Sequence, residues 1–250
     1  MSPESQKNKA FSDAQEVKKF SEFAQDWWNP NGKMKPLHRI NPVRVDYIRD
    51  ELCCAFGLDS TSKKPLAGLS ILDVGCGGGL LSESLSILGA SVVGIDASDK
   101  MISVATLHAK QSNVVVDYRS ADVTEIASSD EKFDVVMSLE VIEHVSDPEQ
   151  FAQTCAGCIK EGGHMFISTI NRTMKSYALA IVGAEYVMKW LPKGTHDWHK
   201  FLKPSEIVNM VRGLSVTAVG MAGLVYNLFD DSWKMSKGDL DVNYLIHFKK

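Results

Sequence analysis

The chain has 250 residues, of which 44% are hydrophobic and 23% are charged, enough to bury the core of one large domain. The formal net charge of -4 comes without a Lys/Arg cluster and argues against a broad nucleic-acid-binding surface. Five scattered cysteines argue against a disulfide framework and indicate a reducing compartment. No run reaches the roughly 18 apolar residues that a membrane-spanning helix needs.

The N-terminal region predicts a helical cap over residues 1–60. Residues 1–20 contain no arginine and no apolar run, so they are typical of neither a secretory signal nor a mitochondrial transit peptide. Two helices are predicted after them, at residues 16–27 and 43–56. A connection that carries Pro and Gly separates the two helices.

From residue 66 to residue 171, short β-branched runs alternate with helical patterns, which is typical of a parallel sheet covered by helices. A helical insertion follows at residues 172–212, and residues 213–250 supply closing strands. The prediction is a single α/β domain with a doubly wound, seven-stranded, mostly parallel sheet. The predicted strands span residues 70–74, 91–95, 114–119, 133–139, 163–170, 214–221 and 242–248. The predicted helices span residues 79–88, 98–110 (with Ser98 as N-cap), 148–159 and 174–191, and one more begins near Pro204.

A glycine-rich turn follows the first predicted strand. It carries Gly75, Gly77 and Gly79 and opens a helix, so its backbone can approach a nucleotide-like ligand at the helix N-terminus. The second strand ends at Asp96, about 20 residues further on, where a carboxylate can accept hydrogen bonds from both ribose hydroxyls. These residues predict a nucleotide-like cofactor bound through its ribose.

The acid before the first glycine selects the cofactor. Asp73 would repel a pyrophosphate, whereas S-adenosylmethionine has no phosphate and carries a cationic sulfonium and amine. We therefore expect S-adenosylmethionine, with Asp73, Gly75, Gly77 and Asp96 at its site. Asp122 follows the third strand and could accept from the adenine amino group, or it could cap a short helix.

An acid and histidine cluster follows the fourth strand at the edge of the sheet where ligands bind. If residues 140–144 form one helical turn, Glu140, Glu143 and His144 share a face. They could then bind magnesium or a similar divalent cation, or His144 could act as a general base without metal beside a paired glutamate. A structural role for His144 as a helix cap is the third interpretation.

With these residues placed, the chain resembles the ubiquinone-biosynthesis O-methyltransferases of bacteria and mitochondria, which have the Rossmann-like class I methyltransferase fold. The resemblance runs from about Phe23 to the C-terminus. It rests on specific segments beyond the glycine loop, at residues 27–29, 35–44, 139–145, 182–186, 192–197 and 241–244. Where relatives usually have Tyr-Asn-Pro, this chain has Tyr226-Asn227-Leu228.

The resemblance implies an activity and a set of site residues. It implies two O-methylations, on a 2-polyprenyl-6-hydroxyphenol and on 3-demethylubiquinol. Arg44, Gly75, Asp96 and Leu139 are then cofactor contacts, and Arg44 could hold the methionine carboxylate as a bidentate partner. The resemblance also favours magnesium at the positions of the acid and histidine cluster. We expect His144 and Glu140 to be the catalytic pair.

Residues 172–203 combine an uncharged apolar stretch with a local net charge of +4, against -8 for the remainder of the chain. Such a segment could lie on an anionic membrane where a polyprenyl substrate resides, or pack on the core as a lid. We expect a cytoplasmic protein, peripheral on the inner membrane, or its mitochondrial matrix-side counterpart. A ubiquinone-biosynthesis complex is a further expected partner. His196 and His199 follow the apolar stretch and are expected to be surface residues.

Two other functions stay open on the sequence alone. A small-RNA ribose 2'-O-methyltransferase would also suit a Glu-x-x-Glu-His cluster, but it requires a basic nucleic-acid surface that this acidic chain does not predict, and no nucleic-acid partner is expected. A non-catalytic methyltransferase-fold subunit would have lost an acid of the glycine loop or one of the paired glutamates. Neither is lost here.

Overall fold

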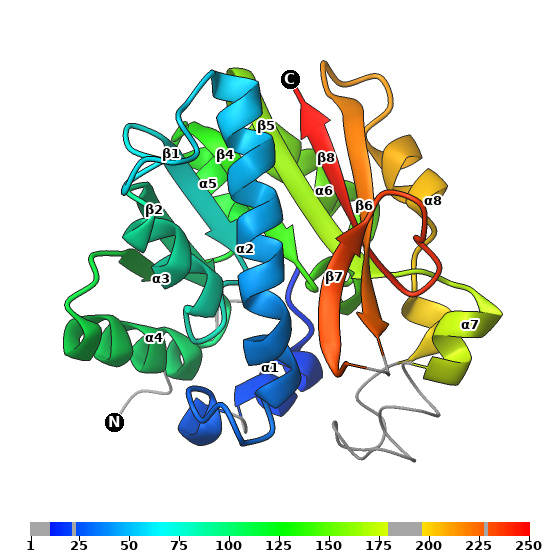
Figure 1. The fold of residues 1–250 in the computed structure, drawn as a ribbon, viewed down its shortest axis with the longest axis horizontal. Coiled ribbons are helices and arrows are strands. Elements are labelled where there is room, and N and C mark those ends of the chain that lie inside the picture. Colours follow the sequence, from blue (N-terminus) through cyan, green and yellow to red (C-terminus); the bar gives the residue numbers. More distant parts are fainter. Residues whose placement is uncertain (1–10, 22–23, 180–196, 228–229) are drawn as a thin grey trace, which may run out of the picture.

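The computed structural model describes residues 11–21, 24–179, 197–227 and 230–250. Within these residues one sheet runs through the molecule, with eight strands in the order β3-β2-β1-β4-β5-β8-β6-β7 (Figure 1). Strands β1 to β5 pair in parallel, whereas β8, β6 and β7 pair antiparallel. The predicted doubly wound α/β class is confirmed. The strands are β1 (Ser70–Val74), β2 (Ser91–Asp96), β3 (Asp117–Ser120), β4 (Phe133–Leu139), β5 (Ile159–Ile170), β6 (Thr217–Asn227), β7 (Ser232–Ser236) and β8 (Asn243–Lys249).

The sheet has one strand more than predicted. Strand β7 folds back on β6 as an antiparallel hairpin, from Gly223 opposite Ser236 to Asn227 opposite Ser232. It is short, it lies at the sheet edge and its side chains are mostly half-buried or exposed, so its sequence lacks a clear apolar alternation. Tertiary pairing with β6, rather than intrinsic pattern, makes it a strand.

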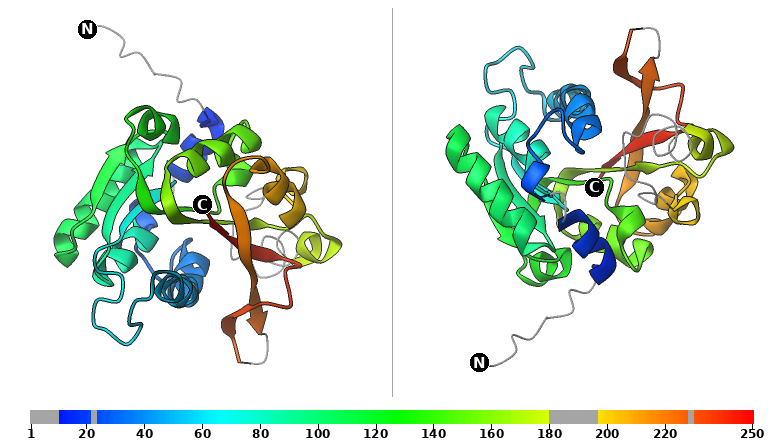
Figure 2. Two further views of the ribbon diagram at one scale, coloured as in Figure 1. Left: turned by 90° about the horizontal axis from the view of Figure 1, so that it is seen from above. Right: turned by 90° about the horizontal axis from the view of Figure 1, so that it is seen from below.

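Helices cover both faces of the sheet, as the views from above and below show (Figure 2). On one face, α2 and α3 pack Ile48, Leu52 and Leu85 against the sheet. On the other face, α5, α6 and α8 bury side chains such as Phe151 and Ile207. The helices are α1 (Ala14–Ser21), α2 (Lys35–Phe56), α3 (Leu80–Ile87), α4 (Asp99–Ser112), α5 (Val123–Ser128), α6 (Pro148–Gly157), α7 (Met174–Ser176) and α8 (Pro204–Met210).

Helix α2 begins eight residues before its predicted start at residue 43. Pro42 lies inside the helix, and Pro36 occupies its first turn, where the missing N–H costs nothing. A proline in a helix interior usually ends the helix, and that rule led to the late predicted start. The long helix matters because its N-terminal half reaches the carboxyl edge of the sheet (Figure 1).

The N-terminal segment also reaches this edge. Ser12 forms an antiparallel bridge with Val145, and the buried ring of Phe11 packs edge-on against Phe151 at 5.8 Å. Helix α1 therefore lies below the carboxyl ends of the parallel strands (Figure 1). Of the predicted insertion helix at residues 174–191, residues 180–191 lie outside the described part of the chain, as does His196. No described helix is both long enough and apolar enough to cross a bilayer.

Candidate active site

A cavity of about 530 Å³ opens at the carboxyl edge of the parallel strands. This volume lies within the usual range for small-molecule and cofactor sites. Open α/β sheets bind ligands at this edge because loops and helix N-termini converge there. All ten site residues predicted from the sequence line the cavity: Arg44, Asp73, Gly75, Gly77, Asp96, Asp122, Leu139, Glu140, Glu143 and His144.

The glycine turn has the backbone that its sequence predicts. Gly75 and Gly77 have φ values of +73° and +55°, in the left-handed region that disfavours a side chain. A Cβ atom on Gly75 would lie 2.5 Å from Cγ2 of Val141, and one on Gly77 would lie 2.7 Å from the Trp27 ring. Two independent constraints, conformation and space, therefore require glycine at each position.

Asp96 fixes the turn from the end of β2. Its Oδ2 accepts from the backbone N–H of Gly77 at 3.0 Å, and its Oδ1 accepts from the backbone N–H of Ser98 at 2.8 Å. The side chain is partly buried and faces the cavity, so it has the place expected of a ribose ligand. The same carboxylate thus shapes the glycine turn and presents oxygen lone pairs to the cavity.

Asp73 is the second acid of the glycine loop, and it is buried. Ser82 on α3 donates its hydroxyl to Oδ2 of Asp73 at 2.5 Å. Burial raises the pKa of Asp73 to about 6, and the nearby Asp96 adds to the rise. A cationic ligand in the cavity would favour the ionised form, which fits a sulfonium and an amine and opposes a pyrophosphate.

Asp122 is the N-cap of α5. Its carboxylate accepts from the backbone N–H of Thr124, and Glu125 reaches back to the backbone N–H of Asp122, which completes a capping box. Its second oxygen accepts from the backbone N–H of Phe11 at 3.2 Å. The capping interpretation is therefore confirmed, and an adenine contact would use a carboxylate that already has protein donors.

Glu140 lies at the point where β4 ends, and its backbone is strained. Its φ of +58° is unusual for a residue with a side chain and costs on the order of 1–2 kcal/mol. Three side chains from three elements hold its carboxylate. Arg44 of α2 forms an ion pair with it, Ser168 of β5 donates at 2.7 Å, and Asn243 of β8 donates at 2.9 Å.

Arg44 is therefore placed by Glu140. Its side chain is only 6% exposed, and it lines the cavity beside the glycine turn. A buried guanidinium needs an anionic partner, and Glu140 supplies one. The predicted contact of Arg44 with a cofactor carboxylate requires the guanidinium to serve two carboxylates, which its planar set of donors allows.

The expected helical turn from Glu140 to His144 is wrong. The left-handed backbone of Glu140 comes before a short 3₁₀ turn that begins only at Ile142. Glu140 therefore points towards α2 and β8, whereas Glu143 is buried and its pKa is raised by that burial to about 7. His144 turns to the N-terminal segment, where its Nδ1 lies 3.1 Å from Oε2 of Glu16.

These three side chains do not fit a magnesium centre in this arrangement. Magnesium needs several oxygen donors around one point, and the carboxylate of Glu140 is already engaged by a buried arginine and two neutral donors. In the part of the chain that the structure describes, no group of three or more His, Cys, Asp or Glu side chains is arranged to hold a metal.

Sequence reasoning missed the contribution of the N-terminal segment to the site. Glu16 of α1 contacts His144, and that contact lowers the pKa of Glu16 to about 2. Trp28 stacks on His108 with ring centroids 3.4 Å apart, and its indole N–H donates to the carbonyl of Gly78. In the sequence, two adjacent tryptophans are the feature of this region that stands out. No local pattern predicts which residues their rings contact.

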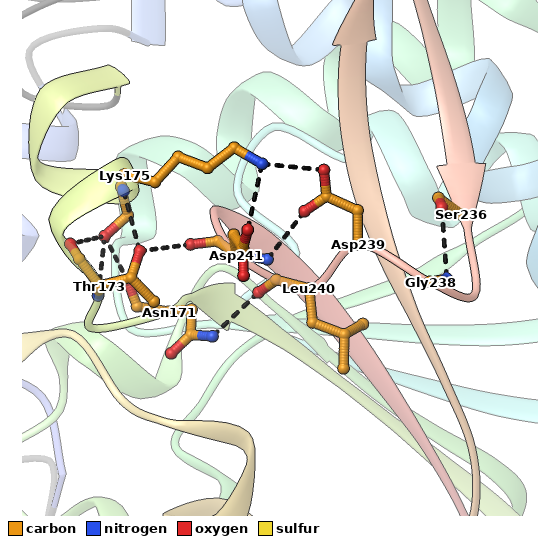
Figure 3. A network of polar contacts seen from close by, with 9 residues as sticks. Asn171, Thr173, Lys175, Ser236, Gly238, Asp239, Leu240 and Asp241 are labelled. Atoms are coloured by element: carbon orange, nitrogen blue, oxygen red, sulfur yellow. Dashed lines mark hydrogen bonds and ion pairs between the residues drawn. The ribbon is translucent and has the colours of Figure 1, made fainter.

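A polar clamp joins α7 to the loop that leads into β8 (Figure 3). Two of its side chains, Lys175 and Asp239, line the cavity. Lys175 reaches across to Asp239 at 2.9 Å and to Asp241 at 3.2 Å. Asn171 donates its side-chain amide to the carbonyl of Leu240, and the Thr173 hydroxyl donates to the carbonyl of Asp241. The clamp holds the residues between β7 and β8 next to the beginning of the insertion.

Comparison with solved structures places this architecture in one class. The chain matches magnesium protoporphyrin IX methyltransferase from Synechocystis PCC 6803 with bound S-adenosylhomocysteine over 93% of this chain and 94% of that one, with a TM-score of 0.64 and 18% identity. It matches the N-methyltransferase NodS from Bradyrhizobium japonicum WM9 over 94% and 97%, with a TM-score of 0.60 and 15% identity. The family model "Methyltransferase domain" matches residues 72–167. These likenesses show the methyltransferase fold, and the family model spans the glycine turn and ends within β5.

Comparison with curated proteins shows to which family of methyltransferases the chain belongs. The ubiquinone biosynthesis O-methyltransferase of Mesorhizobium japonicum is 50% identical over 95% of this chain and 95% of its own length. The protein of the same name from Bartonella quintana is 50% identical over 95% of this chain and 96% of its own. The chain belongs to the ubiquinone biosynthesis O-methyltransferase family. The resemblance noted in the sequence is confirmed.

Proposed function

We propose that this protein transfers methyl groups from S-adenosylmethionine to ring hydroxyls of polyprenylated intermediates of ubiquinone biosynthesis, a 2-polyprenyl-6-hydroxyphenol and 3-demethylubiquinol. The observation that carries the proposal is a cavity lined by a cofactor-type glycine turn, by Glu140 and by His144, in a chain half identical to enzymes named for this pathway. No comparable observation supports the two other functions considered from the sequence, a small-RNA ribose 2'-O-methyltransferase and a non-catalytic methyltransferase-fold subunit.

The cofactor side of the cavity is formed by residues from β2, α2 and β4, from the glycine turn after β1 and from the N-cap of α5. Asp96 offers oxygen atoms for ribose hydroxyls, the turn at Gly75 and Gly77 gives close backbone approach, and Arg44 offers donors for a carboxylate. Leu139 ends β4 beside them and supplies apolar surface, and Asp122 borders the same side. When bound, S-adenosylmethionine supplies an electrophilic methyl group on a positively charged sulfur.

We propose that His144 accepts the proton of the acceptor hydroxyl. A phenol becomes a strong nucleophile only when it loses its proton, and an imidazole within reach can take that proton. Glu16 lies 3.1 Å from Nδ1 of His144, and this contact orients the ring at the cavity. Glu140 lies at the same edge of the sheet, where its ion pair holds Arg44 in place.

Magnesium is a separate proposal. The family resemblance supports an ion at Glu140, Glu143 and His144, whereas the donor arrangement described above does not fit one. No step is therefore derived through a metal. Methyl transfer measured with and without a chelator decides the matter: loss of transfer that added magnesium restores would establish the ion, and unchanged transfer would remove it.

Membrane contact and a place in a ubiquinone-biosynthesis complex are also proposals. Residues 172–203 carry a net charge of +4, and the described beginning of this segment exposes Met174, Tyr177 and Leu179 by 76%, 44% and 49%. Exposed apolar side chains within a basic segment favour an anionic membrane surface, where a polyprenyl substrate would be found.

The function is tested with purified protein, labelled S-adenosylmethionine and a short-chain prenyl catechol. His144→Asn should lower kcat at least about 100-fold, the usual contribution of a positioned base, with little change in cofactor Kd. The matched control is His199→Asn, since His199 is exposed and does not line the cavity. Loss of cofactor affinity without loss of turnover would assign His144 to cofactor binding instead.

A further inference from the structure

Two adjacent tryptophans of the N-terminal segment, Trp27 and Trp28, pack on the glycine turn that opens α3. Trp27 is only 8% exposed, and its ring lies directly over two glycines. A Cβ atom on Gly77 would lie 2.7 Å from this ring, and one on Gly78 would lie 2.3 Å from its Cδ1. The turn therefore accommodates the ring only because both positions lack a side chain.

Trp28 makes a polar contact with the same turn. Its indole N–H donates to the carbonyl of Gly78 at 2.9 Å. The next amide along the chain, the N–H of Gly79, donates to the carbonyl of Cys76 at 3.0 Å. The peptide unit between Gly78 and Gly79 is thus held at both ends, once from within the turn and once from the N-terminal segment.

Helices α3 and α4 hold Trp28 in place. Its ring stacks on the imidazole of His108 in α4, with centroids 3.4 Å apart and ring planes at 4° to each other. Nδ1 of His108 lies 2.9 Å from Oε1 of Glu83 in α3, whose side chain is 5% exposed. The indole N–H therefore has a fixed direction, because the ring cannot rotate without losing this stack.

A turn rich in glycine loses much conformational freedom when it is ordered around a ligand. A bond from outside the turn that fixes one of its peptide units removes part of this cost before the ligand binds. We infer that Trp28, which does not line the cavity, is a positioning residue for the cofactor and acts through the backbone of the glycine turn. The inference rests on the proposed function, because that function assigns S-adenosylmethionine to this turn.

The test compares two variants that lose the same kind of bond. Trp28→Phe keeps an aromatic ring beside His108 but removes the N–H that the carbonyl of Gly78 accepts. Trp198→Phe is the matched control, because the indole N–H of Trp198 also donates to a backbone carbonyl, that of Thr173 at 3.2 Å, and Trp198 does not line the cavity. Calorimetric titration with S-adenosylhomocysteine measures the Kd of each protein.

We expect Trp28→Phe to raise this Kd about fivefold, the effect of one net hydrogen bond, and Trp198→Phe to leave it unchanged. The KM for the acceptor at saturating cofactor should stay at the wild-type value in Trp28→Phe, whereas a general loss of structure would change both constants. Wild-type affinity in Trp28→Phe, an equal loss of affinity in the two variants, or a parallel rise in the acceptor KM overturns the inference.

Should Trp28→Phe fail to fold, wild-type protein labelled with ¹⁵N at its indole nitrogens provides the measurement. The indole NMR signal of Trp28 is assigned by its cross-peaks to the ring of His108, and that of Trp198 by its loss in Trp198→Phe. Binding of S-adenosylhomocysteine should move the Trp28 signal and leave the Trp198 signal in place. An unmoved Trp28 signal overturns the inference.

The outcomes separate this inference from the proposed function. An unchanged Kd in Trp28→Phe, in a protein whose wild type binds S-adenosylhomocysteine and methylates the acceptor, overturns the positioning role alone. Absent methyl transfer by wild-type protein, with the fivefold effect on Kd present, overturns the proposed acceptor and supports the positioning role. If wild-type protein does not bind S-adenosylhomocysteine, both fail.

Discussion

Single residues at this site are fixed by conformation and by space at once. Gly75 and Gly57 both have positive φ values, +73° and +66°. Of the two, only Gly75 has a neighbouring side chain, that of Val141, which an added Cβ atom would meet. Glu140 shows the opposite case, since a residue with a side chain takes the left-handed conformation and three partners hold it there. Backbone strain of this kind is typical of functional sites.

The two glycines form a matched pair for mutation. Gly57→Ala should cost about 1 kcal/mol of stability, because only the left-handed conformation is penalised, and cofactor affinity should not change. Gly75→Ala should weaken cofactor binding at least about tenfold, because the new methyl group would meet Val141 at 2.5 Å and shift the turn. Calorimetric titration and urea unfolding measure the two effects. Equal cofactor affinity in both variants would contradict the role of the turn.

A second pair of residues predicts how stability depends on pH. His164 and His247 are buried on the α2 face of the sheet, with Nδ1 of the first 2.8 Å from Nε2 of the second. Burial and the neighbouring imidazole lower the pKa of His247 to about 4, although Glu51 at 3.5 Å opposes the shift. The unfolded chain, with a histidine pKa of about 6.5, binds more protons between these two values.

The free energy of unfolding should therefore decrease as pH falls from about 6.5 to 4, by up to about 3 kcal/mol from His247. Urea unfolding at several pH values measures this slope. His247→Asn should flatten it, and His199→Asn, at an exposed histidine, should leave it unchanged. An unchanged slope in His247→Asn would show that His247 does not carry the effect.

At the scale of elements, the buried parallel strands could be predicted well and the edges could not. Strands β1 and β4 coincide with their predicted spans, because both are mostly apolar and have clear ends. Strand β7 and the early start of α2 depend on contacts with other elements, and local sequence does not encode such contacts. The turn after β4 was mispredicted because nothing in the sequence shows that Glu140 is left-handed.

Helix caps give a prediction at this scale. Asp122 caps α5 and Asp147 caps α6, but only Asp122 also accepts from the backbone of Phe11. Replacing either aspartate with alanine should cost about 1 kcal/mol. Only Asp122→Ala should also increase hydrogen exchange at the amide of Phe11. Equal exchange in the two variants would show that Asp122 does not anchor the N-terminal segment.

At the scale of the molecule, the cavity is assembled from parts that are distant in the chain. The N-terminal segment, the parallel strands, the hairpin and the beginning of the insertion meet at one end of the sheet (Figure 1). The sequence predicted the glycines and acids that line one part of this cavity, because they follow one another along consecutive strands. It could not identify Glu16, since its partner His144 lies more than 100 residues further along the chain.

The basic insertion gives a prediction for the whole protein. Cosedimentation with anionic vesicles should exceed cosedimentation with neutral vesicles, because residues 172–203 carry a net charge of +4. Reversing Lys189 and Lys193 to glutamate should reduce anionic binding, while the same reversal of the exposed Lys63 and Lys64 should not. Equal binding to both kinds of vesicle would remove the electrostatic part of the membrane proposal.

The proposed reaction transfers a methyl group to a ring oxygen. The protein is incubated with a prenylated dihydroxybenzene and S-adenosylmethionine labelled with ¹³C in its methyl group, and the label in the product is located by NMR. We expect one new methoxy carbon on the ring and no label on ring carbons or on the tail. Label on carbon, or transfer to small RNA in place of the ring, would contradict it.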